Sequence, residues 1–164
     1  MIMDRLWAPW RIEYIRNPGS GCFLCEALKK KSHAEALVIE KEKEAFTIMN
    51  RYPYNTGHLM VAPVRHIGLL EELNDTEILA MHRLLTRAIK ACNATIKPQG
   101  FNIGINQGQT AGAGVISHIH IHLVPRWQGD TNFMPVISDT KVVSEALQQT
   151  YQKLKEGLLK LDNP

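Results

Sequence analysis

Three of the seven histidines stand at alternate positions, as His118, His120 and His122, in the segment SHIHIHLVPR that spans 117–126. Side chains of an extended chain alternate between two faces, so the three imidazoles are predicted on one face and the intervening aliphatic residues on the other. A neutral imidazole is a competent nucleophile, and neighbouring rings can hold charge or donate hydrogen bonds. The pattern therefore predicts attack on phosphorus or carbonyl carbon, and it suits nucleotidyl transfer.

The loop before the histidines is almost bare of side chains. It has the sequence GQTAGAG and joins two predicted strands, 101–107 and 118–126, so its backbone can approach a ligand closely. For any single histidine, the alternative is a solvent-facing strand whose polar side happens to be histidine. The regular spacing of three beside this loop favours the chemical interpretation.

Two of the three cysteines, Cys22 and Cys25, form a C-x-x-C pair. An odd number of cysteines argues against a disulfide framework, and this spacing suits metal or redox chemistry. Tetrahedral zinc needs two further ligands, for which every histidine is a candidate, although His33 and His82 are expected on the surface. The alternatives are a reduced thiol pair without metal, or a redox pair lacking its usual βαβ context.

The elements that must position these residues are predicted from hydrophobic periodicity. Segments 45–50 and 58–63 are predicted as strands of a hairpin, and 22–31 as a short helix. The sequence from Asn74 to Glu77 resembles a capping box and starts a long amphipathic helix that stops at Pro98. Its predicted buried face consists of Ile78, Met81, Leu85, Ala88, Ile89, Cys92 and Ile96.

Strands before and after one long helix, with short connections, favour the α+β class. A second helix is predicted over 139–160, and residues 1–20, rich in Trp and Pro, are expected to form an irregular N-terminal arm. We therefore expect a single domain over 1–164, in which one long helix packs on an antiparallel sheet and an additional helix ends the chain.

The composition is that of an ordinary globular protein, with 45% apolar and 21% charged residues. The net charge of +3 is too small to imply a nucleic-acid partner, and the short lysine runs are expected to be solvated faces. No apolar run approaches the length of a membrane helix, and the N-terminus lacks the apolar region of a secretory signal. These features predict a cytoplasmic protein without a membrane partner.

The motif H-x-H-x-H followed by Leu-Val-Pro-Arg resembles the signature of the histidine triad (HIT) superfamily of nucleotide hydrolases and transferases. The segment MNRYPYNTGHLMVAP, 49–63, is similar to that family's substrate-side hairpin. RLWAPWR and PRWQGDTNFM resemble the bacterial branch related to diadenosine tetraphosphate phosphorylases. The resemblance covers about Arg5 to Ile137 and implies a HIT-like fold.

The resemblance implies that His120 attacks an α-phosphorus and forms a covalent nucleotidyl-histidine, which water or phosphate then resolves. For this attack, the other ring nitrogen of His120 must carry the proton, and a backbone carbonyl could fix that tautomer. His122 is implied to hydrogen-bond the phosphate or the leaving oxygen, and His118 completes the catalytic set. His58 could support the site from behind or be a satisfied strand-end histidine.

Nucleotide contacts are implied for Asn50 at the ribose and for Gln107 or Asn106 at the phosphates. Backbone amides at Gly112, Ala113 and Gly114 are implied to face the developing charge. Many relatives carry Gly-Gln where this chain has Ala113-Gly114, so one side-chain amide near the bridging oxygen is missing. A structural zinc site is implied by resemblance, with the ligands Cys22, Cys25, His66 and His118.

The implied substrate is a dinucleoside polyphosphate or a related nucleoside phosphate, with an adenine nucleotide expected, and the implied assembly is a homodimer. Hydrolysis and phosphorolysis both remain open. One alternative is nucleotidyl transfer to a sugar phosphate, although this chain has about half the length that such two-domain transferases require. Another is a nucleotide-binding regulatory module with little turnover.

Overall fold

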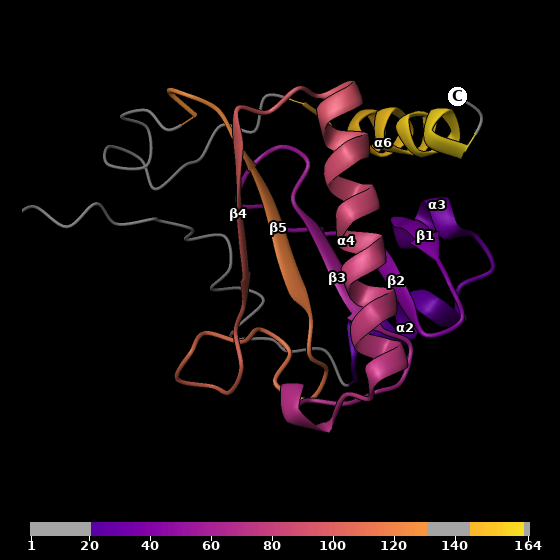
Figure 1. Cartoon of the computed structure of the whole chain (residues 1–164), viewed down its shortest axis with the longest axis vertical. Helices are drawn as coiled ribbons and strands as arrows, with labels where there is room; N and C mark the ends of the chain where they lie inside the picture. The colour runs from indigo at the N-terminus through magenta and orange to yellow at the C-terminus, as the bar shows by residue number, and fades with distance from the viewer. Residues whose placement is uncertain (1–20, 131–144, 163–164) are drawn as a thin grey trace, which may run out of the picture.

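An antiparallel sheet of five strands, in the order β1-β2-β3-β5-β4, occupies the middle of the molecule (Figure 1). The structure is a computed structural model that describes residues 21–130 and 145–162. The strands are β1 (Val38–Lys41), β2 (Ala45–Met49), β3 (Leu59–Pro63), β4 (Gly100–Ile105) and β5 (Ile121–Arg126). The predicted hairpin is confirmed, because β2 and β3 pair in antiparallel register along their full lengths.

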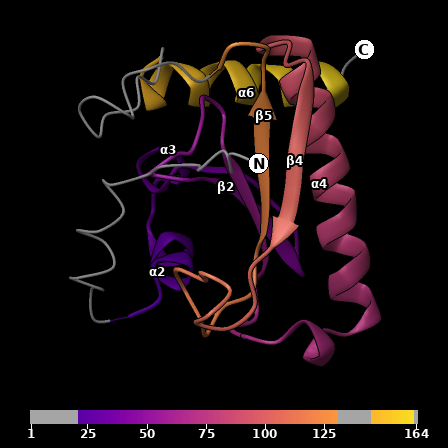
Figure 2. The same ribbon diagram turned by 90° about the vertical axis from the view of Figure 1, so that its left-hand side faces the viewer.

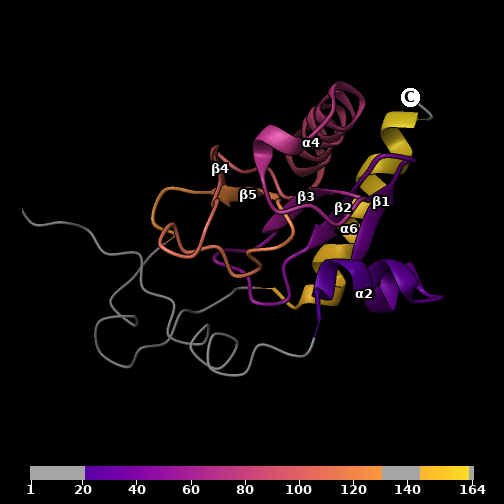
Figure 3. The same ribbon diagram turned by 90° about the horizontal axis from the view of Figure 1, so that it is seen from below.

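The helices lie on both sides of this sheet. They are α2 (Phe23–Lys29), α3 (His33–Ala36), α4 (Asp75–Thr95) and α6 (Leu147–Asp162), with a 3-10 helix η1 (Leu70–Glu72) before α4. Figure 3 shows α4 and α2 on opposite sides of the strands. The expected α+β class is therefore confirmed, including the long helix on the sheet and the additional C-terminal helix.

Helix α4 starts at the predicted capping box. The Asn74 side chain accepts from the Glu77 amide, and the Glu77 carboxylate accepts from the Asn74 amide. The prediction that Ile78 belongs to the buried face is wrong, because its side chain is 48% exposed. Glu77 is buried in this turn instead, and its carboxylate binds the Arg65 guanidinium through two hydrogen bonds of 2.7 Å.

Helix α6 begins at Leu147, later than the predicted start at 139, since Glu145 and Ala146 are not helical. Residues 139–144 of that prediction, like the N-terminal arm 1–20, lie outside the described residues. Gly157 of α6 lies against the last turns of α4, where a Cβ would stand 2.7 Å from the Thr95 methyl and 3.2 Å from the Ala91 oxygen. The absence of a side chain thus lets the two helices cross closely.

The predicted strand 118–126 begins only at Ile121, so its first three residues were assigned wrongly. The Ile119 amide donates to the Ile67 carbonyl at 2.6 Å, and the His118 carbonyl bonds the His120 ring at 2.9 Å. These contacts take the place of the ladder that β5 forms with β3 and β4 from Ile121 onward. Of the three histidines, only His122 lies within the strand.

Three short elements, α3, β1 and the three-residue η1, were not predicted from the sequence. Helix α3 and strand β1 have four residues each, which is too short to display a periodic pattern. They place Leu37 and Val38 in the core beside β2. Within residues 21–130 and 145–162, no helix combines the length and the apolar character needed to cross a bilayer.

Candidate active site and metal site

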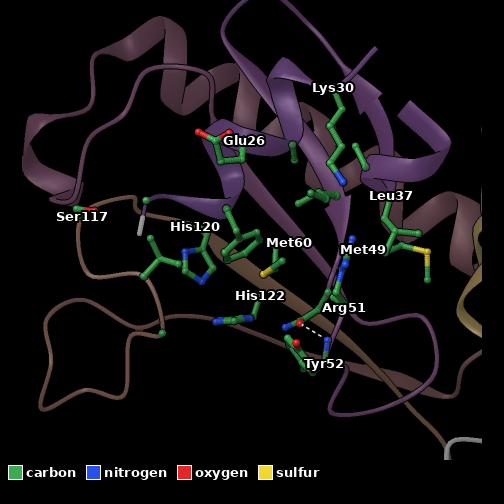
Figure 4. Close-up of a pocket in the computed structure, with 18 of the residues that line it drawn as sticks. Glu26, Lys30, Leu37, Met49, Arg51, Tyr52, Met60, Ser117, His120 and His122 are labelled. Atoms are coloured by element: carbon green, nitrogen blue, oxygen red, sulfur yellow. Dashed lines mark hydrogen bonds between the residues drawn. The ribbon is translucent and has the colours of Figure 1, made fainter. Parts of the chain in front are cut away.

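A cavity of about 640 Å³ opens between α2, the β2–β3 hairpin and the loop before β5 (Figure 4). Its floor is a row of side chains that the strand pairing aligns: Ile48 stands opposite Met60, and Met60 stands opposite His122. Directly opposed residues of an antiparallel sheet share a face, so the row places an imidazole beside an apolar surface. Figure 4 shows Met60 between the histidine rings and the pair Leu37 and Met49.

The cavity lining combines an apolar surface with polar and charged groups. Its apolar lining comes from α2, α3, the sheet and the loop before β5, and consists of Phe23, Ala27, Ala36, Leu37, Ile48, Met49, Met60, Val115 and Ile116. Polar groups reach it from Asn50, Tyr52, Ser117, His120 and His122, and the charged residues Glu26, Lys30 and Arg51 also line it. An apolar compartment that ends in nitrogen donors and acceptors matches a nucleoside whose phosphate points toward the histidines.

His120 is held in a single tautomer by a backbone contact. Its Nδ1 lies 2.9 Å from the His118 carbonyl oxygen, which can only accept, so Nδ1 carries the proton. The lone pair of the neutral ring is therefore on Nε2. His120 is 4% exposed and lines the cavity, and its ring stands 4.7 Å from that of His122. This is the tautomer that attack through Nε2 requires.

His122 is held in the opposite tautomer by a chain of two hydrogen bonds. The Tyr54 amide donates to Nδ1 of His58 at 3.1 Å, so the proton of the neutral His58 ring is on Nε2. That Nε2 lies 3.0 Å from Nδ1 of His122 and donates to it. His122 consequently carries its proton on Nε2, as a donor. His58, which is fully buried, thus orients His122.

The residues implied for nucleotide binding fall into three groups. Asn50 and Gly114 line the large cavity. Asn106 lines a second cavity of about 250 Å³, which adjoins β4 and also includes His122. Gln107 lines neither of these two cavities, because its amide accepts from the Leu70 amide at 2.8 Å and donates to Glu71 at 3.0 Å.

The glycine-rich loop approaches the site less than expected. Gly112 and Ala113 do not belong to the lining of either cavity, whereas Gly114 and the next three residues line the large one. Sequence reasoning also missed the wall that α2 contributes. Phe23, Ala27 and Lys30 line the cavity and are spaced as residues on one face of a helix. This spacing, directly after Cys22, could have predicted the wall from the sequence.

The four residues implied as metal ligands lie together. Their ligand atoms, from Cys22, Cys25, His66 and His118, are all within 4.8 Å of one another. Sγ of Cys22 is 3.2 Å and Sγ of Cys25 is 3.5 Å from Nδ1 of His118, and Sγ of Cys25 is 3.2 Å from Nδ1 of His66. Two thiols and two imidazoles form a closed set of four donors, which suits a structural metal ion.

The surroundings of His118 fix its ring in the tautomer that can bind a metal ion through Nδ1. Nε2 lies 2.9 Å from the Pro63 carbonyl, so it carries the proton and leaves the lone pair on Nδ1, toward the thiols. Burial is the largest influence on the pKa of His118 and lowers it, although the hydrogen bond to Pro63 acts in the opposite direction. The lowered pKa favours the neutral ring, which is the form that binds a metal ion. Burial first, and then Cys22, raise the pKa of the Cys25 thiol to about 11, so an ion that binds there displaces a proton.

Comparisons with known proteins support the family and the fold. The HIT domain family model matches residues 31–129. AP-4-A phosphorylase from Mycobacterium tuberculosis is 37% identical, over 93% of this chain and 83% of that protein. Adenosine 5'-monophosphoramidase from Candida albicans is 26% identical, over 88% and 95%.

A solved structure shares the architecture. It is a Zn-bound histidine triad family protein from Mycobacterium smegmatis, with a TM-score of 0.70 and 24% identity over 87% of this chain and 96% of that one. That likeness shows the fold, while the family model and the mycobacterial phosphorylase show the relationship in sequence. This chain therefore belongs to the HIT domain family.

Proposed function

We propose that this protein is a nucleotide phosphohydrolase or phosphorylase that acts on dinucleoside polyphosphates or related nucleoside phosphates through a covalent nucleotidyl-His120. The observation that carries the proposal is the pair of opposite tautomers in one cavity, with a lone pair on Nε2 of His120 and a proton on Nε2 of His122. A nucleophile beside a hydrogen-bond donor for the leaving oxygen suits displacement at phosphorus. The 37% identity to a protein named AP-4-A phosphorylase supports this substrate class.

The proposed reaction has two displacements. Nε2 of His120 attacks the α-phosphorus, the bond from phosphorus to the leaving oxygen breaks, and that oxygen leaves as a phosphate anion that accepts a hydrogen bond from Nε2 of His122. The His118 carbonyl stabilises the positive charge that develops on the His120 ring, since it accepts from Nδ1. Phosphate, or water that gives its proton to solvent, then attacks the same phosphorus; the bond from phosphorus to Nε2 breaks and His120 leaves as the neutral imidazole.

In this proposal the two cavities bind different parts of the substrate and so fix its orientation. Asn50 and the apolar lining of the large cavity receive the nucleoside that is transferred. His122 lines both cavities, so a leaving group bonded to its Nε2 can extend toward the smaller one, past Asn106. The predicted roles of Gln107, Gly112 and Ala113 in binding phosphate have no support in these contacts.

Product analysis tests the proposal. Diadenosine tetraphosphate is incubated with the protein, with and without inorganic phosphate, and the nucleotides are separated by chromatography. Transfer of AMP to His120 releases ATP in both cases, followed by ADP when phosphate resolves the intermediate or AMP when water does. Binding of the dinucleotide without any product would favour the regulatory module and contradict the proposal.

We also propose that Cys22, Cys25, His66 and His118 hold a structural zinc ion. The closed set of two thiols and two imidazoles and the tautomer of His118 support zinc, as does a likeness in fold to a protein described as Zn-bound. When bound, the ion cross-links the segments before α2, after β3 and before β5. Cysteine thiols kept reduced for a metal also accord with the predicted cytoplasmic location.

A homodimer is the assembly that we propose, and the outer strand β4 supports it. Ile103 and Ile105 on β4 are 49% and 36% exposed, and β4 pairs with β5 on one side only among the described strands. Figure 2 shows this edge of the sheet facing the viewer. Exposed apolar residues on a sheet edge are normally covered by a partner, and an isologous pairing of two such edges closes on itself.

Replacing Ile103 by Lys is therefore expected to shift the protein from dimer to monomer. The charge would be buried without a partner in the joined edges, so the dissociation constant should rise by about 100-fold. Sedimentation velocity over a concentration series measures the change. The control is Leu159→Lys, which alters a side chain that is 59% exposed on α6. A monomeric wild-type protein would refute the dimer.

His58→Leu is expected to lower kcat by about 100-fold, because His122 then loses the donor that fixes its tautomer. His58→Gln can still present an N–H toward Nδ1 of His122 and should retain more activity. Steady-state kinetics on the tetraphosphate measure both variants, with thermal melts to separate activity from folding. Equal kcat values for the Leu and Gln variants would show that the hydrogen bond from His58 to His122 does not contribute to turnover.

A further inference from the structure

Helix α2 carries the metal site and a wall of the nucleotide cavity on neighbouring faces. Cys22, at its N-cap, and Cys25 point toward His66 and His118. Phe23 and Ala27 line the large cavity from the same helix, and Lys30 lines it from the residue that caps the helix end. Because α2 has only seven residues, its own hydrogen bonds do not fix it, and its position depends on tertiary contacts.

The other two ligands connect the metal site to the rest of the cavity. The backbone carbonyl of His118 holds the proton on His120, two residues away. Beyond His66, the Ile67 carbonyl accepts from the Ile119 amide at 2.6 Å. Gly68 then packs so closely on the next segment that a Cβ there would stand 2.8 Å from the Ile116 oxygen. Ile116 and Ser117 line the cavity. The segment after His66 and the segment before His118 therefore connect the metal ligands to the cavity lining.

We infer that Cys22 and Cys25 are positioning residues for nucleotide recognition: through a metal ion shared with His66 and His118 they fix α2 against the cavity, so metal and nucleotide strengthen each other's binding. The inference rests on the proposed function, which puts the nucleoside against Phe23 and Ala27. Without the ion, nucleotide binding must also order α2, and that cost weakens the observed affinity. Linkage requires the effect to be equal in both directions.

The expected coupling is about 10-fold in each dissociation constant. The full-length protein is stripped with a chelator or reloaded with zinc, and circular dichroism at low temperature verifies that both forms are folded. Calorimetry then gives the dissociation constant of AMP for each form. In the reverse direction, competition with a chromogenic chelator gives the zinc affinity with and without saturating AMP. A role confined to stability would move neither quantity in folded protein.

Variants separate the positioning role from a general loss of folding. Cys25→Ser should weaken zinc and AMP together, while Cys25→His, which keeps a metal ligand, should restore both in part. Phe23→Ala leaves the four ligands in place but removes the α2 side chain that faces the nucleoside, so AMP should no longer raise the zinc affinity. His33→Ala, an exposed histidine on α3, is the matched control and should change neither constant.

The outcomes distinguish this inference from the proposed function. Equal AMP affinities of the stripped and reloaded proteins, or an undiminished effect of AMP on zinc in Phe23→Ala, would overturn the coupling while leaving nucleotide binding intact. If AMP binds neither form, the nucleotide site itself is wrong and both proposals fall. If the stripped protein does not fold, the zinc competition with Phe23→Ala decides the matter, because that variant is measured in its loaded form.

Discussion

His120→Ala is expected to lower kcat/KM for diadenosine tetraphosphate by about 10,000-fold or more and to abolish the covalent intermediate. The substitution removes the ring whose proton the His118 carbonyl holds on Nδ1, which leaves the lone pair on Nε2 in the lining of the cavity. His122 cannot replace it, because its Nδ1 accepts from His58 and its Nε2 bears the proton. The remaining residues still bind nucleotide, so the dissociation constant of AMP should change little.

Intact-mass spectrometry after a brief exposure to substrate measures the intermediate directly. Wild-type protein should gain the mass of one adenylyl group, and the His120→Ala protein should gain none. His82→Ala is a matched control, since His82 is an exposed histidine on α4, away from the cavity lining. An adduct that persists in His120→Ala, or one found in neither protein while products still form, would exclude the proposed intermediate.

The sequence predicted the elements whose signals are local. The capping box of α4, the β2–β3 hairpin and the grouping of Cys22 and Cys25 depend on neighbours in the chain, and each is present in the structure. The burial of Glu77 was not predictable in this way, because its partner Arg65 is twelve residues away. Ile78 is exposed because the buried face of α4 runs through Glu77, Ala80 and Leu84, and Ile78 lies to one side of it.

The arrangement of the three histidines was predicted in part. Strict alternation on one strand fails because the Ile119 amide bonds Ile67, a contact between segments far apart in sequence. As a result His118 turns to the thiols while His120 and His122 face the cavity. Gln107 lies outside the lining of both cavities for a similar reason, since its side-chain amide is hydrogen-bonded to η1. Periodicity cannot reveal which distant backbone group will bond a given side chain.

Removal of the metal ion is expected to lower the melting temperature of the wild-type protein by about 10 °C. An ion present at about 1,000 times its dissociation constant stabilises the folded state by about 4 kcal/mol, and each kcal/mol corresponds to about 2–4 °C at this chain length. The ion would join α2 to His66 and to the segment before β5, so its loss frees several elements at once. Differential scanning calorimetry with and without chelator, alongside elemental analysis for zinc, measures the effect.

Cys22→Ser should reproduce the effect of the chelator and make the protein insensitive to it, because serine is a poor ligand for zinc. Cys92→Ala is the informative control. Cys92 is fully buried in α4, outside the ligand cluster, and burial raises the pKa of its thiol to about 12. That variant should lose some stability through a small cavity yet keep its zinc and its response to chelator. A wild-type protein that carries no zinc and melts at the same temperature with and without chelator would show that the four side chains are only a polar cluster.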